Sequence, residues 1–123
     1  MKAAAPRYAA PLDLPRPRGA RLLEAFSPKL GRRVRFFDRA TFDQWIRLEA
    51  DPAVQCLCER PQRLGTERDA RVADFWVQRH DGEVLQVVHD GDAPSDGPQA
   101  TLHSFGGVAV EHIGAPELAA VSI

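Results

Sequence analysis

The sequence predicts an α/β domain in which a small mixed sheet packs against one main helix. At 123 residues the chain is long enough to form one domain with a modest core. Apolar residues recur at helical spacing over residues 39–50, whereas several other stretches are short and rich in β-branched and aromatic residues. A strand, a helix, a second strand and then a hairpin, in that order, are typical of a helix packed on a mixed sheet.

The overall composition is that of an ordinary globular protein, with 44% hydrophobic and 27% charged residues. No apolar run approaches the roughly 18–20 residues that cross a membrane, and Pro and Arg interrupt the first residues too often for a secretory signal. Cys56 and Cys58 imply no disulfide framework, so a cytoplasmic location is expected. We expect both cysteines to be small buried residues, since the histidines show no zinc-ligand spacing.

Residues 1–26 are predicted to form a flexible basic arm that precedes a domain over residues 27–123, because the arm is rich in Pro, Ala and Arg. Residues 1–40 carry 10 basic and 3 acidic side chains, a balance of +7, whereas residues 41–123 carry 6 basic and 14 acidic side chains, a balance of −8. A basic arm on an acidic body suits contact with phosphates, since bound Lys and Arg release counterions. The alternative is a tail that docks on the protein's own acidic face.

The first half of the chain should contain one strand and the main helix. Residues 20–28 are expected to form a short helical turn that stops before a proline. Arg33–Phe37 alternates polar and apolar residues like a strand. Asp38 is the predicted N-cap of a helix over Arg39–Ala50, which ends at Asp51 and the proline that follows.

The second half should supply the rest of the sheet. The runs Arg71–Gln78 and Glu83–His89 are predicted to form a hairpin around the turn sequence His-Asp-Gly. Trp45 and Trp76 are expected in the core, one on the helix and one on the hairpin, in contact with each other. The remaining predicted elements are a strand at Val54–Cys58, a loop at Asp90–Gln99, a strand at Val108–Ile113 and a short helix at Pro116–Val121.

A metal-dependent phosphodiesterase needs carboxylates on adjacent strand ends, because they hold the cations that bind the scissile phosphate. Four segments of this chain occur in the order of such a core: PKLGRRVRF, LEADPAV, ERP and VADFWVQRHDGEVLQVVH. Together they resemble the N-terminal domain of the TnsA family of transposon endonucleases over about half the chain. The resemblance implies a restriction-endonuclease-like fold of the PD-(D/E)XK class. It also implies DNA as a partner, and Mg²⁺ or Mn²⁺ in an active member.

The resemblance supplies few of the family's metal-binding carboxylates. Asp74 matches the central Asp of the family, but Thr41 occupies the position of a helix Glu. Glu59, at a strand end, is the most credible further donor. A carboxylate that is hydrogen-bonded to a neighbouring backbone N–H is the alternative interpretation of Asp74.

The last strand of the hairpin can be aligned with the family in two registers. One register puts Val87 and His89 where the family has an acid and a Lys, and a one-residue shift puts Gln86 and Val88 there instead. Neither register gives enough hard oxygen ligands to hold one or two divalent ions, so no cofactor is expected.

These considerations define the candidate site residues. If the chain cleaves DNA, its catalytic residues are predicted to be Asp74, Gln86 and His89, with Asp74 and Glu59 as metal ligands. The predicted DNA contacts are Arg32, Arg33, Arg35 and Arg39.

The favoured function is a DNA-binding or assembly subunit of a TnsA-like transposition system, without nuclease activity, acting beside a transposase or another nuclease. An active endonuclease with an atypical site is one alternative. A protein-interaction module that does not contact nucleic acid is the other, and the acidic body favours it.

Overall fold

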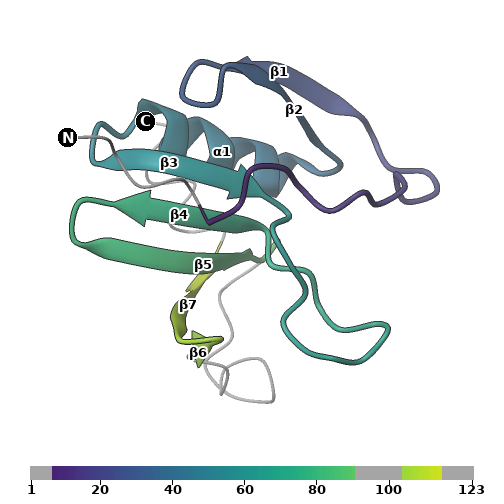
Figure 1. The fold of residues 1–123 in the computed structure, drawn as a ribbon. Coiled ribbons are helices and arrows are strands. Elements are labelled where there is room, and N and C mark those ends of the chain that lie inside the picture. The colour runs from purple at the N-terminus through teal and green to yellow at the C-terminus, as the bar shows by residue number, and fades with distance from the viewer. Residues whose placement is uncertain (1–6, 91–103, 115–123) are drawn as a thin grey trace.

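The computed structural model describes residues 7–90 and 104–114. These residues form an α/β fold with one helix and two sheets (Figure 1), which confirms the predicted fold class. The elements are β1 (Leu23–Ser27), β2 (Arg32–Phe36), α1 (Arg39–Ala50), β3 (Val54–Glu59), β4 (Phe75–Arg79), β5 (Gly82–Val88), β6 (Ser104–Phe105) and β7 (Val108–Ile113).

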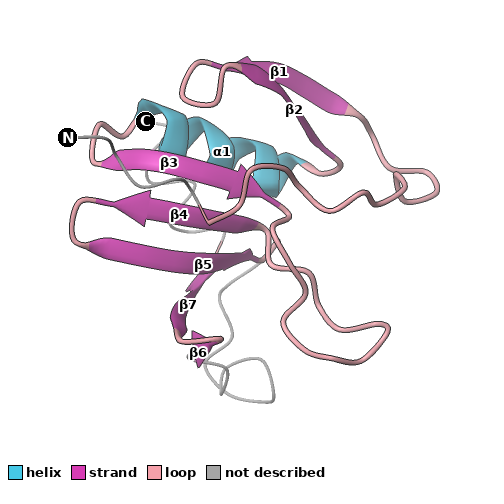
Figure 2. Ribbon diagram, viewed as in Figure 1, coloured by secondary structure: helices cyan, strands magenta, loops and turns pink. Residues whose placement is uncertain are grey.

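The larger sheet has the strand order β3-β4-β5-β7-β6 and is mixed. The pairing of β5 with β7 is parallel, whereas β3–β4, β4–β5 and β6–β7 are antiparallel. Strands β1 and β2 form a separate antiparallel hairpin. Figure 2 shows α1 and this hairpin together, on one side of the larger sheet.

The helix begins and ends where local chemistry dictates. Asp38 has an extended backbone, and its side chain accepts a hydrogen bond from the backbone N–H of Thr41 at 2.8 Å, as an N-cap does. At the other end, the N–H of Asp51 bonds to the carbonyl of Leu48. The helix over Arg39–Ala50 is therefore confirmed at both ends.

The larger sheet has an apolar cluster on each face. The first cluster packs α1 and β2 on the sheet, and it contains Trp45 together with Phe36, Leu57 and Phe75. The second cluster contains Trp76, among other residues. Successive side chains of β4 point to opposite faces, which places Phe75 in one cluster and Trp76 in the other. The expected contact between Trp45 and Trp76 is therefore wrong, although both rings are buried.

The segment before Pro28 forms strand β1 rather than the expected helical turn. Within β1, Leu23 and Ala25 lie on the partly buried side, and Glu24 and Phe26 are exposed. This period of two matches a strand that is covered on one side, and pairing with β2 satisfies its backbone groups. The boundary expected between residues 26 and 27 thus falls inside β1.

The described part of the arm lies on the body. Arg7 donates to both carboxylate oxygens of Glu83, at 2.5 and 2.8 Å. The ring of Tyr8 packs edge-on against Trp76, with 5.6 Å between centroids. Farther along, the N–H of Leu12 donates to the carbonyl of Arg60 at 2.9 Å. Residues 7–12 are therefore attached to the body, and Tyr8 covers part of the second apolar cluster.

The β4–β5 hairpin forms around the predicted turn, with Arg79 paired to Gly82, but its first strand begins at Phe75 rather than at the predicted Arg71. Gly82 has φ +149°, which a side chain would rarely adopt. The loop predicted over Asp90–Gln99 lies outside the described residues except for Asp90, and so does the helix predicted over Pro116–Val121. Among the described residues, no helix has the length and apolar content needed to cross a bilayer.

Candidate functional site

Asp74 immediately precedes β4 and is held by the neighbouring strand. Its backbone N–H donates to the carbonyl of Gln86 at 2.8 Å. Its carboxylate atom Oδ2 accepts hydrogen bonds from the N–H of Val88 at 2.7 Å and from the Arg71 guanidinium at 3.0 Å. This is the alternative arrangement expected from the sequence, a carboxylate bonded to a backbone N–H. Burial raises the pKa of Asp74, and the two hydrogen bonds only partly oppose it.

A cavity of about 60 Å³ adjoins Asp74. Its lining residues are Phe36, Phe37, Asp38, Thr41, Arg60 and Asp74. The hydroxyl of Thr41 lies 3.1 Å from Oδ1 of Asp38, and the charge of Asp38 further raises the pKa of Asp74. The cavity thus brings the predicted position of the family's helix Glu close to Asp74, but a hydroxyl stands there.

The lining of this cavity combines carboxylates with a guanidinium. Asp38 and Asp74 are its two carboxylates, and Arg60 contributes a guanidinium to the same lining. Burial lowers the pKa of Arg60, while the charges of Glu59 and Asp74 raise it. Magnesium prefers near-octahedral oxygen ligands and needs several hard donors. Across residues 7–90 and 104–114, no three His, Cys, Asp or Glu side chains are grouped so that they could hold a metal ion.

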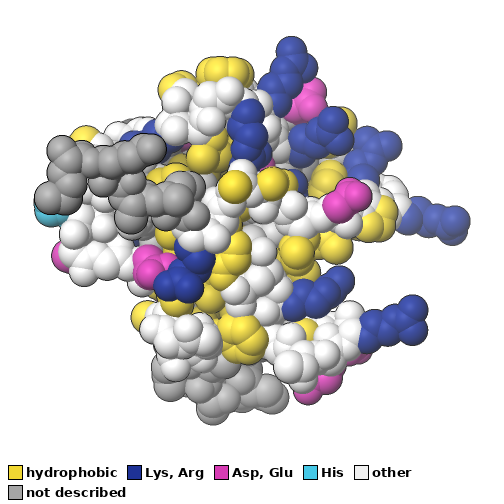
Figure 3. Space-filling view, in the orientation of Figure 1, with side chains coloured by type: hydrophobic (Ala, Val, Ile, Leu, Met, Phe, Trp, Pro, Cys, Tyr) yellow, Lys and Arg dark blue, Asp and Glu magenta, His cyan; other side chains and the backbone are white. Residues whose placement is uncertain are grey.

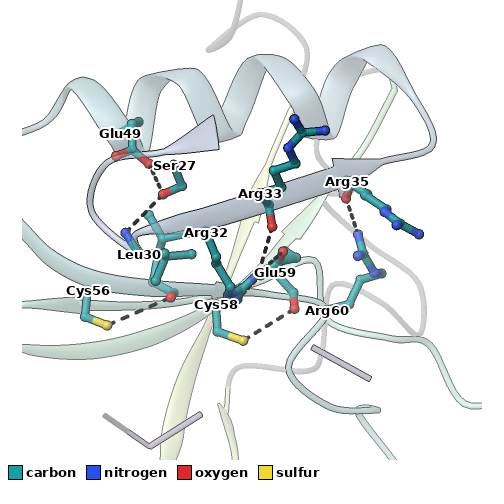
Figure 4. A network of polar contacts seen from close by, with 11 residues as sticks. Ser27, Leu30, Arg32, Arg33, Arg35, Glu49, Cys56, Cys58, Glu59 and Arg60 are labelled. Carbon is teal, nitrogen blue, oxygen red and sulfur yellow. Dashed lines mark hydrogen bonds and ion pairs between the residues drawn. The ribbon is translucent and has the colours of Figure 1, made fainter. Parts of the chain in front are cut away.

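Glu59, the other expected metal donor, is 1% exposed and is fully engaged by Arg32. The two guanidinium nitrogens of Arg32 donate to the two oxygens of Glu59, each at 2.8 Å (Figure 4). This bidentate geometry is the strong form of an Arg–carboxylate pair. The hydrogen bond to Glu59 also raises the pKa of Arg32. Glu59 therefore neutralises an arginine of β2, and Arg32 has a structural partner.

The two polar residues expected beside Asp74 lie on opposite faces of the sheet. Gln86 is 1% exposed and lies toward α1, where it accepts a hydrogen bond from Gln44 at 2.9 Å and donates to Glu111 at 2.8 Å. His89 instead stacks on His112, with 5.2 Å between ring centroids. A nitrogen of each ring lies 3.0 Å from the other.

The two registers considered for β5 use residues on different faces of the sheet. Val88 belongs to the apolar cluster under α1, and Val87 belongs to the cluster on the opposite face. Because strand side chains alternate, Gln86 shares the helix side with Val88. Burial, together with Arg71 and His112, lowers the pKa of His89. Strand pairing thus brings Asp74 next to Gln86, but Gln86 and His89 lie on opposite faces of the sheet.

Three of the arginines predicted to contact DNA point to solvent. The side chains of Arg33 and Arg35 are 77% and 65% exposed, and both pair with Glu24, at 3.5 and 3.2 Å. Arg39 is 75% exposed and pairs with Asp43 one helical turn later, at 2.8 Å. Figure 4 shows that Arg33 extends from β2 on the side opposite to Arg32.

Three further arginines lie in the loop before β1. Arg16, Arg18 and Arg21 are all exposed, and within the described residues none of them takes part in an ion pair or hydrogen bond. Lys and Arg side chains gather on the side of the molecule that carries this loop and the β1–β2 hairpin (Figure 3). We call Arg16, Arg18, Arg21, Arg33 and Arg35 the basic face.

The hairpin that presents this face is anchored to the end of the helix. Glu49 accepts hydrogen bonds from the Ser27 hydroxyl and from the N–H of Lys29, each at 2.7 Å. The Lys29 ammonium donates to the carbonyls of Asp51 and Val54, at 2.9 and 2.7 Å. Two of the segments that carry the family resemblance, PKLGRRVRF and LEADPAV, are thus in direct contact.

Sequence reasoning missed several residues of these sites. Asp38 was expected only as a helix cap, and Gln44 was not singled out although it bonds to Gln86. Arg60 has φ +44°, a conformation that non-glycine residues rarely adopt, and no sequence pattern indicated it. The basic composition of the arm indicated the loop arginines. No sequence pattern indicated that Phe26 would be exposed.

No protein-family model matches the chain, and a search of curated proteins finds no match.

Proposed function

We propose that this chain is a cytoplasmic DNA-binding subunit that does not cleave DNA and acts beside a transposase or another nuclease in a TnsA-like system. Support for the DNA-binding part comes from the charge of the basic face. Support for the transposition part comes from the four sequence segments that resemble the TnsA family. Support for the absence of cleavage comes from the way each candidate carboxylate is already engaged.

The observation that carries the proposal is a set of arginines that have no partner among residues 7–90 and 104–114. Arg16, Arg18 and Arg21 are exposed and form no ion pair within the described residues. An arginine with no protein partner gives up only its hydration and side-chain freedom when it contacts a phosphate. Each such contact releases condensed counterions from DNA and so favours binding.

The loop that carries these arginines is locally stiff. Arg16 stands between Pro15 and Pro17, and each proline fixes its own φ and restricts the residue before it. Pro17–Ala20 form a turn that is closed by a hydrogen bond from the N–H of Ala20 to the carbonyl of Pro17 at 3.0 Å, so Arg18 lies in this turn between Arg16 and Arg21. Less conformational freedom is then lost when a DNA backbone is bound than in a fully flexible arm.

Arg33 and Arg35 add to this surface, although both share the carboxylate of Glu24. Exposed ion pairs of this kind contribute only about 0–1 kcal/mol, so phosphates can replace Glu24 as their partner. Arg32 does not belong to this surface, because its guanidinium is bound to the buried Glu59. Within the proposal its role is to hold β2 on the sheet.

Binding should be measured by fluorescence anisotropy with a labelled DNA duplex at a series of salt concentrations. We expect the affinity to fall steeply with salt, and the variant Arg16→Gln/Arg18→Gln/Arg21→Gln should lower the slope of log K against log salt by about 2–3. Arg68→Gln is the matched control, since Arg68 is exposed on a loop of the acidic body. Absence of duplex binding, or an affinity that does not depend on salt, would refute the DNA-binding proposal.

Cleavage should be tested separately with a supercoiled plasmid in the presence of Mg²⁺ or Mn²⁺. We expect no nicking, because Glu59 is bound to Arg32 and Arg60 shares the cavity of Asp74. Metal-dependent nicking that disappears in Asp74→Ala would establish the active endonuclease instead.

A further inference from the structure

The outer side of the β1–β2 hairpin combines an exposed aromatic ring with two arginines. In β1 the alternation of side chains turns Leu23 and Ala25 inward and leaves Phe26 outward. Phe26 is 59% exposed and is the aromatic residue among the exposed large hydrophobic residues of the described chain. By contrast, Phe36, Phe75 and Trp76 are each at most 1% exposed. The Phe26 ring is therefore available for contact with a partner.

Arginine side chains flank this ring in a fixed register. Phe26 pairs with Arg33 across the hairpin, and Glu24 pairs with Arg35. Directly opposite residues on one face of a strand pair lie about 4.5–5.5 Å apart at Cβ, and diagonal neighbours lie about 7–8 Å apart. Phe26 therefore has one arginine beside it and a second within reach along the same face.

A shallow hollow adjoins the ring. It has a volume of about 270 Å³ and is lined by Glu24, Ala25, Phe26 and Arg33. This is smaller than the roughly 300–1,000 Å³ of pockets that enclose drug-sized ligands. It suits one flat ring system that lies on Phe26, with its charged part directed to the arginines.

We infer that Phe26, Arg33 and Arg35 form a platform for single-stranded DNA, in which an unpaired base stacks on Phe26 and the adjacent phosphates contact the two arginines. This inference rests on the proposed DNA-binding function and narrows it to one form of DNA. Aromatic side chains in basic grooves bind single strands in this way, because every base has a π-face. In a duplex both faces of each base are already stacked on neighbouring bases, so Phe26 gains little there.

The charge of the platform favours a polyanion. Arg33 and Arg35 together exceed the single carboxylate of Glu24, which lies 3.5 and 3.2 Å from them. Glu24 must release both arginines when phosphates arrive. Its removal should therefore strengthen binding, which is the opposite of what the loss of a favourable contact would do.

The test compares a labelled oligothymidylate with a labelled duplex of the same length. Phe26→Ala should weaken binding of the single strand about tenfold, with the duplex affinity nearly unchanged, and Phe26→Tyr should retain binding. Glu24→Gln should tighten binding of the single strand. Ile46→Ala is the control, because Ile46 is an exposed apolar residue on α1 with 45% exposure.

The outcomes separate this inference from the proposed function. If the unmodified protein binds the duplex but not the oligothymidylate, the platform is refuted and duplex binding stands. If Phe26→Ala weakens both DNA forms equally, or neither, the stacking role of Phe26 is refuted, and a surface for a protein partner becomes the explanation of the exposed ring. If the protein binds neither form of DNA, both proposals fail. Circular dichroism of each variant checks that the fold is retained.

Discussion

The basic face and the cavity beside Asp74 differ in whether their charged side chains have partners within the protein. On the basic face, Arg16, Arg18 and Arg21 have no partner among the described residues. Beside the cavity, by contrast, Asp74 accepts from Val88 and Arg71. A carboxylate that is already hydrogen-bonded must give up its partners to bind a ligand, whereas an exposed unpaired arginine gives up only its hydration and side-chain freedom. The capacity to bind an external partner therefore lies on the arginine side.

The pair of Arg32 and the buried Glu59 is also internally matched, like the groups around Asp74. Breaking it should give the largest effect on stability. Arg32→Met leaves Glu59, which is 1% exposed, without its bidentate partner. We expect a loss of about 2–4 kcal/mol in the free energy of unfolding, since breaking a buried pair strands a charge and Arg32 is itself partly exposed. Urea unfolding measures this.

The double variant Arg32→Met/Glu59→Gln should recover at least half of that loss, because no charge is then left buried. Arg33→Met, one residue along the strand and exposed, should change the stability by less than about 0.5 kcal/mol. A loss for Arg32→Met as small as that for Arg33→Met would show that the pair does not set the stability of the hairpin.

The contact of Tyr8 with Trp76 tests whether residues 7–12 belong to the body. Tyr8→Ala removes the edge-on ring contact at 5.6 Å and uncovers Trp76. We expect a loss of about 1–2 kcal/mol in the free energy of unfolding. In a Trp45→Phe background, the emission of Trp76 should shift to the red, and the exposed arm residue Asp13 provides the control as Asp13→Ala. Unchanged emission in Tyr8→Ala would mean that the arm does not cover the ring in solution.

Asp74 and Glu83 should give opposite pH dependences of stability. Burial raises the pKa of Asp74 above its ordinary value of 3.8, so its contribution to stability is greatest in acid and is lost as the pH rises through the folded pKa. Hydrogen bonds from Arg7 and Trp76 lower the pKa of Glu83 to about 2, so its contribution is present at neutral pH and is lost as the pH falls from about 4.5 toward 2.

Unfolding curves of Asp74→Asn and Glu83→Gln over that pH range measure the two contributions. As the pH rises, the free energy of unfolding of Asp74→Asn should increase relative to that of the unmodified protein. That of Glu83→Gln should decrease relative to that of the unmodified protein. We expect each difference to be modest, because both carboxylates retain contact with water. Two differences of the same sign would contradict the environments described for these groups.

Elements whose signals are local could be predicted from the sequence. The helix over Arg39–Ala50 is capped by the residue directly before it, Asp38, and ends at the residue directly after it, Asp51. Strand β1 has no such signal, because its conformation depends on pairing with β2 and on the apolar cover beneath it. The apolar content of Leu22–Phe26 alone is compatible with either a helix or a strand.

The candidate site could be predicted only in part. Asp74 was singled out because it matches the central Asp of the family that the sequence resembles, whereas the exposure of Arg33 and Arg35 follows from strand alternation. The bond between Arg32 and Glu59 joins residues 27 positions apart, and the bond between Gln44 and Gln86 joins residues 42 positions apart. Such partners depend on how the hairpin and helix pack on the sheet, which no local pattern specifies.

Arg39, which was also predicted to contact DNA, offers the smallest effect. It is 75% exposed and pairs with Asp43 on α1, yet it sits at the helix N-terminus, where a positive charge is unfavourable. Because these two effects oppose each other, Arg39→Gln should change the free energy of unfolding by less than about 0.5 kcal/mol. If Arg39 also contacts a phosphate, the variant should lower the salt slope of duplex binding by about one. A slope that stays the same would confine the DNA-binding surface to the loop before β1 and to β2, with Arg39 paired to Asp43 alone.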